Sequence, residues 1–134
     1  MRRIAFFALS AMLLSGPYAF AGAPNPVREE MWLLDAAFKN LIDAVILKNP
    51  SSIPQIFRGL EKARAETEKA KRRGEIALPK NPDKMKLFVQ FDSEFHEGLE
   101  GLIQASKKGD MPKVERLTHK LLDDCIKCHS MFRR

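Results

Sequence analysis

Residues 110–132 read DMPKVERLTHKLLDDCIKCHSMF, and this stretch decides the fold class. Asp110 is a favourable helix N-cap, and Pro112 falls in the first turn, where a proline costs no hydrogen bond. Apolar side chains then recur every three or four residues, which predicts one long helix with a single buried face. That face consists of Val114, Leu117, Leu121, Cys125, Cys128 and Phe132.

The same stretch contains Cys125-Ile126-Lys127-Cys128-His129, a C-x-x-C-H motif that uses both cysteines of the chain. This motif is typical of covalent haem c attachment: each thiol bonds to the haem, and the histidine binds the iron as proximal ligand. A thioredoxin-like pair would need a βαβ context, and a structural zinc site would need four convergent ligands. Since the sequence shows neither context, it predicts one covalently bound haem c.

The N-terminus has the pattern of a secretory signal peptide. Arg2 and Arg3 precede an apolar run over residues 4–14, and Ala19-Phe20-Ala21 is a cleavage signal. The apolar run is too short for a membrane anchor, and no later segment has a transmembrane pattern. We therefore expect a signal peptide over residues 1–21, a single domain over 22–134, and a periplasmic location. With both cysteines bound to haem, we expect no disulfide.

Net charge says little about partners. The chain carries +6, and removal of the signal peptide takes two of its 23 basic residues and none of its 17 acidic ones, which leaves +4. The basic run KAKRR at residues 69–73 has no interleaved aromatic side chains, so we expect a solvated helix end and no nucleic-acid site.

Three further helices are expected, over residues 26–48, 51–73 and from 82 to about 107. Asn49-Pro50 ends the first, Gly74 closes the second, and Asn81 caps the third. Four helices joined by short loops predict an all-α fold, an antiparallel up-down-up-down four-helix bundle. The expected apolar stripes are Val27, Met31, Leu34, Phe38, Leu41 and Val45 in the first helix, Ile53, Ile56, Phe57 and Leu60 in the second, and Met85, Phe88, Phe91, Phe95, Leu99 and Leu102 in the third.

This topology brings the end of the fourth helix to the start of the first. His129 and Met31 each lie a little over one turn from those ends, so the two are expected at the same level. The second helix offers only small groups there, Ala63, Thr67 and Ala70, and the resulting gap is the expected place for the haem.

These features resemble the cytochrome c′/cytochrome c-556 family, a four-helix bundle with C-x-x-C-H near its C-terminus. The resemblance covers the whole chain after residue 21 and is strongest in the ending C-I-K-C-H-S-M-F-R at 125–133. It implies that Cys125 and Cys128 are the thioether attachments and His129 the proximal ligand. It also implies that Arg133 lies beside the proximal imidazole and that Arg28 lies near a haem propionate; an ordinary surface role remains open for both arginines.

Two functions remain open on the distal side of the iron. If Met31 is the second axial ligand, the resemblance implies a six-coordinate electron carrier. If the position is open, it implies a c′-type protein that binds nitric oxide or carbon monoxide. Matching Arg28 to the family's helix-one arginine would place Trp32 over the iron, whereas the helical stripe favours Met31, which we prefer. Met31 as mere core packing is a third interpretation.

Other residues are expected to have ordinary roles. Met85 resembles a packing position, Met131 shares a helix with His129, and His96 and His119 are expected to be partly solvated surface histidines. No nucleophile or acid–base group accompanies the haem motif, so we expect no enzyme activity. The resemblance further implies redox partner proteins and a homodimer through helices one and two, to which Ala36, Ala37 and Ala44 would give close packing.

Overall fold

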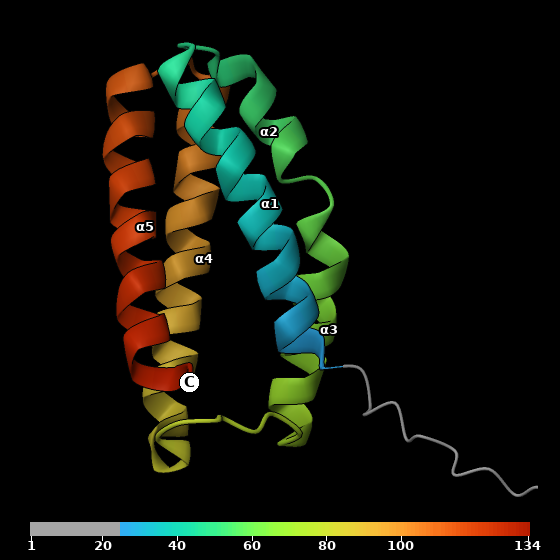
Figure 1. The fold of residues 1–134 in the computed structure, drawn as a ribbon. Coiled ribbons are helices and arrows are strands. Elements are labelled where there is room, and N and C mark those ends of the chain that lie inside the picture. Colours follow the sequence, from blue (N-terminus) through green and yellow to red (C-terminus); the bar gives the residue numbers. More distant parts are fainter. Residues whose placement is uncertain (1–24) are drawn as a thin grey trace, which may run out of the picture.

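A computed structural model describes residues 25–134, and within them the fold is all-α, without strands (Figure 1). This confirms the expected all-α class. The elements are α1 (Pro26–Ile46), the short 3₁₀ turn η1 (Pro50–Ser52), α2 (Ile53–Ile56), α3 (Leu60–Arg73), the 3₁₀ turn η2 (Pro82–Lys84), α4 (Met85–Lys107) and α5 (Met111–Phe132). Residues 1–24, which include the predicted signal peptide, lie outside the described part of the chain.

The long helices lie side by side, as in a helical bundle (Figure 1). The closest packing joins α4 to α5 and α1 to α3. The end of α5 and the start of α1 lie at the same end of the molecule (Figure 1), where Val27 and Met131 pack against one apolar cluster. The two chain segments therefore lie at the same end of the molecule and contribute to one apolar cluster.

Helix starts follow the local sequence signals in α1 and α5. The Asn25 side chain accepts a hydrogen bond from the Arg28 amide at 3.2 Å, and Asp110 accepts one from the Lys113 amide at 3.1 Å. Each cap is followed by a proline in the first turn. Gly74 closes α3 with a φ of 66°, a left-handed conformation that glycine adopts without steric cost.

The second predicted helix, 51–73, is not continuous. A turn over Phe57 to Gly59 separates α2 from α3, with short-range bonds from the Arg58 amide to the Gln55 carbonyl and from the Leu60 amide to the Phe57 carbonyl. Gly59 is a poor helix former, which favours a break at this point. Phe57 stays buried and meets the ring of Phe38 edge-on at 6.2 Å.

Asn81 does not cap the next helix as expected. It has a φ of 51°, and its side chain makes no cap hydrogen bond. Instead, its Nδ2 donates to the Met131 carbonyl at 2.7 Å, while Lys80 Nζ donates to the Ser130 carbonyl at 2.7 Å. The last carbonyls of a helix have no partner within the helix. The loop before η2 therefore caps the C-terminus of α5.

Two apolar clusters form the interior. The larger runs through the middle of the molecule and includes Leu41, Ile53, Leu102 and Leu121. The smaller lies at the end where α5 terminates, and consists of Leu78, Phe88 and Phe132 with partly buried neighbours. The Phe88 and Phe132 rings meet edge-on at 5.5 Å. Among the described residues, no helix is both long and apolar enough to cross a membrane.

Candidate functional site

The C-x-x-C-H motif lies in the last turns of α5. Cys128 and His129 follow Cys125 by three and four residues, so the three side chains share one side of the helix. Cys125 packs against the larger apolar cluster and Cys128 against the smaller one. Both cysteines are free thiols and half-buried. The motif therefore lies where the two clusters meet.

The local environment sets the protonation states of the motif. Burial, together with Asp124 and Cys128, raises the pKa of Cys125 to about 11. Burial, together with Asp92, also raises the pKa of Cys128. His129 is exposed as a whole residue, but partial burial lowers its pKa. The charge of Arg133 lowers this pKa further. At neutral pH the imidazole is therefore neutral, which is the form that binds a metal.

This donor set fits a covalently attached haem. Two thiols and one neutral imidazole share one side of a helix, next to apolar side chains on either flank. These are the groups that a haem c attachment uses, and haem iron needs only one ligand from the motif. In residues 25–134 no three His, Cys, Asp or Glu side chains come together as a metal-ligand group, which a zinc site would require.

A shallow pocket of about 280 Å³ lies between residues of α1 and α5. Ile42 of α1 and Thr118 of α5 line it together. Met31 stands 11 residues before Ile42, and His129 stands 11 residues after Thr118. Eleven residues are about three turns, so each residue lies on the same side of its helix as its pocket residue, about 16 Å along the axis. The pocket is lined by Ile42, Val45, Ile46, Thr118, His119, Leu122 and Asp123.

Met31 and His129 are therefore in helical phase with residues of α1 and α5 that line this pocket. Met31 and His129 are shifted from the pocket toward the same end of the molecule, because the start of α1 and the end of α5 lie at that end (Figure 1). Met31 is half-buried and packs against the larger cluster. Trp32 is 80% exposed, which places its indole in solvent and not over the motif. Of the two distal candidates, only Met31 lies on the inner side of α1.

The two arginines of the predicted site are exposed. Arg133 directly follows α5, and its amide donates to the His129 carbonyl at 3.0 Å. Its charge also lowers the pKa of His129. Arg28 lies in the first turn of α1, where its amide is held by the Asn25 cap. Arg133 thus contacts His129 through its backbone amide, and Arg28 lies one turn before Met31 and Trp32.

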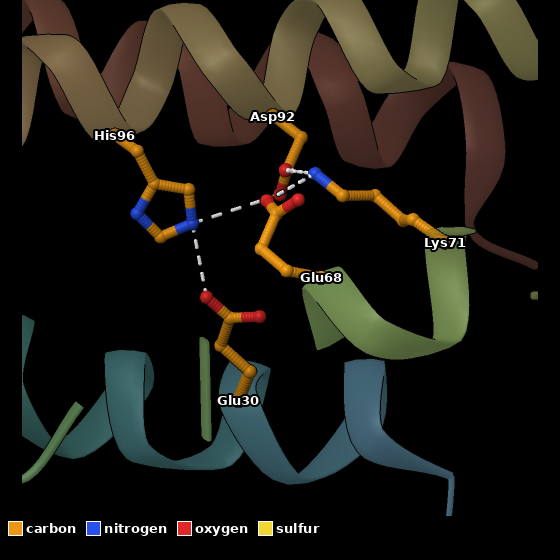
Figure 2. A network of polar contacts seen from close by, with 5 residues as sticks. All are labelled: Glu30, Glu68, Lys71, Asp92 and His96. Atoms are coloured by element: carbon orange, nitrogen blue, oxygen red, sulfur yellow. Dashed lines mark hydrogen bonds and ion pairs between the residues drawn. The ribbon is translucent and has the colours of Figure 1, made fainter. Parts of the chain in front are cut away.

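Five ionisable side chains form a buried ionic cluster at this end of the molecule (Figure 2). Glu30 extends from α1, Glu68 and Lys71 from α3, and Asp92 and His96 from α4. His96 Nε2 lies 2.9 Å from Glu30 Oε1 and 3.7 Å from Asp92 Oδ1. Lys71 Nζ lies 2.6 Å from Asp92 Oδ2 and also pairs with Glu68. The cluster thus joins the α1–α3 pair to α4.

Three expectations are wrong at this cluster. His96 is only 4% exposed and not a surface histidine. Lys71, inside the basic run 69–73, turns its side chain inward, where it is 8% exposed. The small residue Thr67 borders the Glu30 carboxylate and not an open gap. Charged groups are buried here because they find partners on neighbouring helices.

Glu30 is the most buried member of the cluster, at 0% exposure. Burial by itself raises the pKa of Glu30, but the contacts with His96 and Thr67 outweigh it, so the pKa is lowered. The 2.9 Å contact with His96 has the distance of a hydrogen bond but not its direction, and neither carboxylate oxygen has an aligned donor. The two side chains therefore make a close polar contact, which is an ion pair when His96 is protonated.

One sequence signal marks Glu30 as buried. The core positions of α1 are Leu34, Ala37, Leu41 and Ala44, spaced three and four apart, and Glu30 stands four residues before the first of them. A charge at a core position indicates a buried partner. Ala37 and Ala44 thus belong to the core of this chain, while Ala36 is exposed.

Comparisons with protein families, with curated proteins and with solved structures found no match for this chain.

Proposed function

We propose that this chain is a periplasmic monohaem c-type cytochrome that carries single electrons. In this proposal it is an antiparallel up-down-up-down bundle, with Cys125 and Cys128 as the covalent attachments and His129 and Met31 as the axial ligands. The haem supplies a reversible one-electron change at iron. In this proposal the protein binds the haem, shields it from water and adjusts its reduction potential.

The observation that carries the proposal is the relation between Met31 and His129. Each lies three turns along its helix, α1 or α5, from a residue that lines a pocket shared by the two helices. A thioether and a neutral imidazole on opposing helices are a known axial pair for haem iron. The lowered pKa of His129 supports the same role, because a protonated imidazole cannot bind iron.

The apolar surroundings suit an electron carrier. Phe88 and Phe91 both contact Phe132, one turn beyond Cys128, with ring centroids 5.5 Å and 6.2 Å apart. Lys127 covers the outer side of Phe91, with its Nζ 4.4 Å from the ring centroid. These apolar side chains limit the access of water to the inner side of the motif. Fewer water molecules then have to reorient when the iron changes its charge.

Optical spectroscopy tests the proposal directly. The full chain is expressed in a bacterium that exports proteins and attaches haem c, and the purified protein is measured oxidised, reduced, and reduced with carbon monoxide. We expect low-spin bands that carbon monoxide does not move. High-spin bands that carbon monoxide shifts would replace the electron carrier by a gas-binding protein with His129 as sole ligand. A protein without covalent haem would refute both functions.

A further inference from the structure

The buried ionic cluster has an excess of negative charge. Three carboxylates, Glu30, Glu68 and Asp92, are paired with one lysine and one histidine. Its formal charge is −1 when His96 is protonated and −2 when it is neutral. Since Glu30, Lys71, Asp92 and His96 are each less than a tenth exposed at the side chain, solvent screens this charge poorly.

The cluster lies beside the proposed haem site on two sides. Glu30 directly precedes Met31 and is turned about 100° from it around α1, toward α3 and α4. On the other side, the charge of Asp92 acts on the thiol of Cys128. The neighbouring Phe91 contacts Phe132 in the last turn of α5. The negative charge is therefore buried at the level of the motif.

We propose that the buried ionic cluster sets the reduction potential of the group held by Cys125, Cys128 and His129, by favouring its oxidised state. The inference rests on the proposed function. A buried negative charge stabilises the more positive, oxidised iron, and the interaction is strong where the effective dielectric constant is low. Second-shell charge of this kind is one of the means by which a protein tunes haem iron.

The test compares charge changes of opposite sign in the haem-loaded protein. Glu30→Gln and Asp92→Asn each remove a negative charge at nearly constant shape, and we expect both to raise the midpoint potential. Lys71→Met removes the positive charge, and we expect it to lower the potential. Glu100→Gln is the matched control: it removes the same charge from an exposed position on α4, eight residues and about 12 Å from Asp92, and should leave the potential unchanged.

Shifts of the midpoint potential in opposite directions distinguish an electrostatic effect from structural damage. Loss of the distal ligand would lower the potential in every variant and would also alter the low-spin bands. Shifts of one sign in all three cluster variants, or no shift in any of them, would overturn the inference.

A second readout needs no haem. In the unloaded Cys125→Ser chain, Cys128 is converted to a thiocyanate, whose nitrile stretching frequency reports the local electric field. We expect Asp92→Asn and Lys71→Met to move this frequency in opposite directions and Glu100→Gln to leave it unchanged. A frequency that none of the variants moves refutes the inference. A chain that attaches no haem refutes the proposed function, and the nitrile shift still decides whether the cluster acts on the motif.

Discussion

His96 Nε2 in α4 lies 2.9 Å from Glu30 Oε1 in α1, and the two side chains are 3% and 0% exposed. This pair crosses the interior between helices that belong to different closely packed pairs, α1 with α3 and α4 with α5. It therefore fixes the rotation of α1 about its own axis. With this rotation Met31, the next residue, packs half-buried against the larger apolar cluster, and Trp32 lies in solvent.

Replacing His96 by leucine should destabilise the protein strongly. The change leaves the Glu30 carboxylate buried without the polar side chain that it contacts, and breaking a buried charge pair in this way typically costs about 3–5 kcal/mol. The double variant Glu30→Leu/His96→Leu should recover most of this loss, because no uncompensated charge remains. The free energy of unfolding in urea measures both effects. His119→Leu, at an exposed position of α5, is the control and should change stability by less than about 0.5 kcal/mol.

Much of the fold is encoded locally and could be predicted. Asn25 and Asp110 cap their helices as their side-chain chemistry dictates, and the apolar spacing marks the buried sides of α1, α4 and α5. The turn at Phe57 to Gly59 could not be predicted, because the apolar spacing of Phe57 and Leu60 suits one continuous helix equally well. The role of Asn81 was hidden for another reason: its partner, the Met131 carbonyl, is 50 residues away.

In the candidate site, too, some residues could be predicted from the sequence and others could not. Cys125, Cys128 and His129 form a motif within five residues, so the sequence alone predicts them. Lys71 instead stands among exposed basic residues, and only the approach of Asp92 explains why its side chain is buried. Burial lowers the pKa of Lys71, but its pairing with Asp92 and Glu68 outweighs this and raises it. A side chain whose ion-pair partners lie on other helices cannot be recognised from the residues next to it in the sequence.

Met31→Ala should convert the haem-loaded protein from low-spin to high-spin and create binding of carbon monoxide. The thioether is removed and alanine offers no ligand, so one axial position opens. Absorption spectra with and without carbon monoxide measure the change. Met85→Ala is the control, because Met85 is a half-buried packing residue against the smaller apolar cluster. Unchanged spectra in Met31→Ala would mean that Met31 only packs the core.

Trp32→Ala should leave the haem spectrum and the carbon monoxide response unchanged. The indole is 80% exposed and lies on the outer side of α1, so its removal opens no path to the motif. The spectra of this variant and of Met31→Ala are best recorded side by side. New carbon monoxide binding in Trp32→Ala would instead assign the distal cover to the indole.

Asn81 should contribute to stability through both its side chain and its backbone. Asn81→Ala removes the 2.7 Å hydrogen bond to the Met131 carbonyl and places alanine at a φ of 51°. We expect a loss of about 2 kcal/mol, roughly half from each effect. Asn81→Gly relieves the backbone part and should lose only about 1 kcal/mol. Urea unfolding separates the two variants, and equal losses would contradict a backbone contribution.

Cys125 should make the stability of the unloaded protein depend on alkaline pH. The surroundings raise the pKa of this thiol from 9.0 to about 11, so the folded state favours the protonated form. Its contribution is therefore complete below pH 9.0 and is lost as the pH rises through about 11. Because Cys125 is only half-buried and solvent screens part of the effect, we expect a contribution of about 1–2 kcal/mol.

The measurement is the free energy of unfolding of the reduced, unloaded chain from about pH 8 to 11, compared with that of Cys125→Ala. The alanine variant lacks the ionising thiol, so the difference between the two proteins isolates this one group from lysines such as Lys71 that titrate in the same range. We expect the stability advantage of the wild type to shrink above pH 9.0, the ordinary pKa of a cysteine thiol. A difference that stays constant with pH would mean that the thiol is not desolvated in the folded chain. In the haem-loaded protein the dependence should disappear, because a thioether sulfur carries no proton to lose.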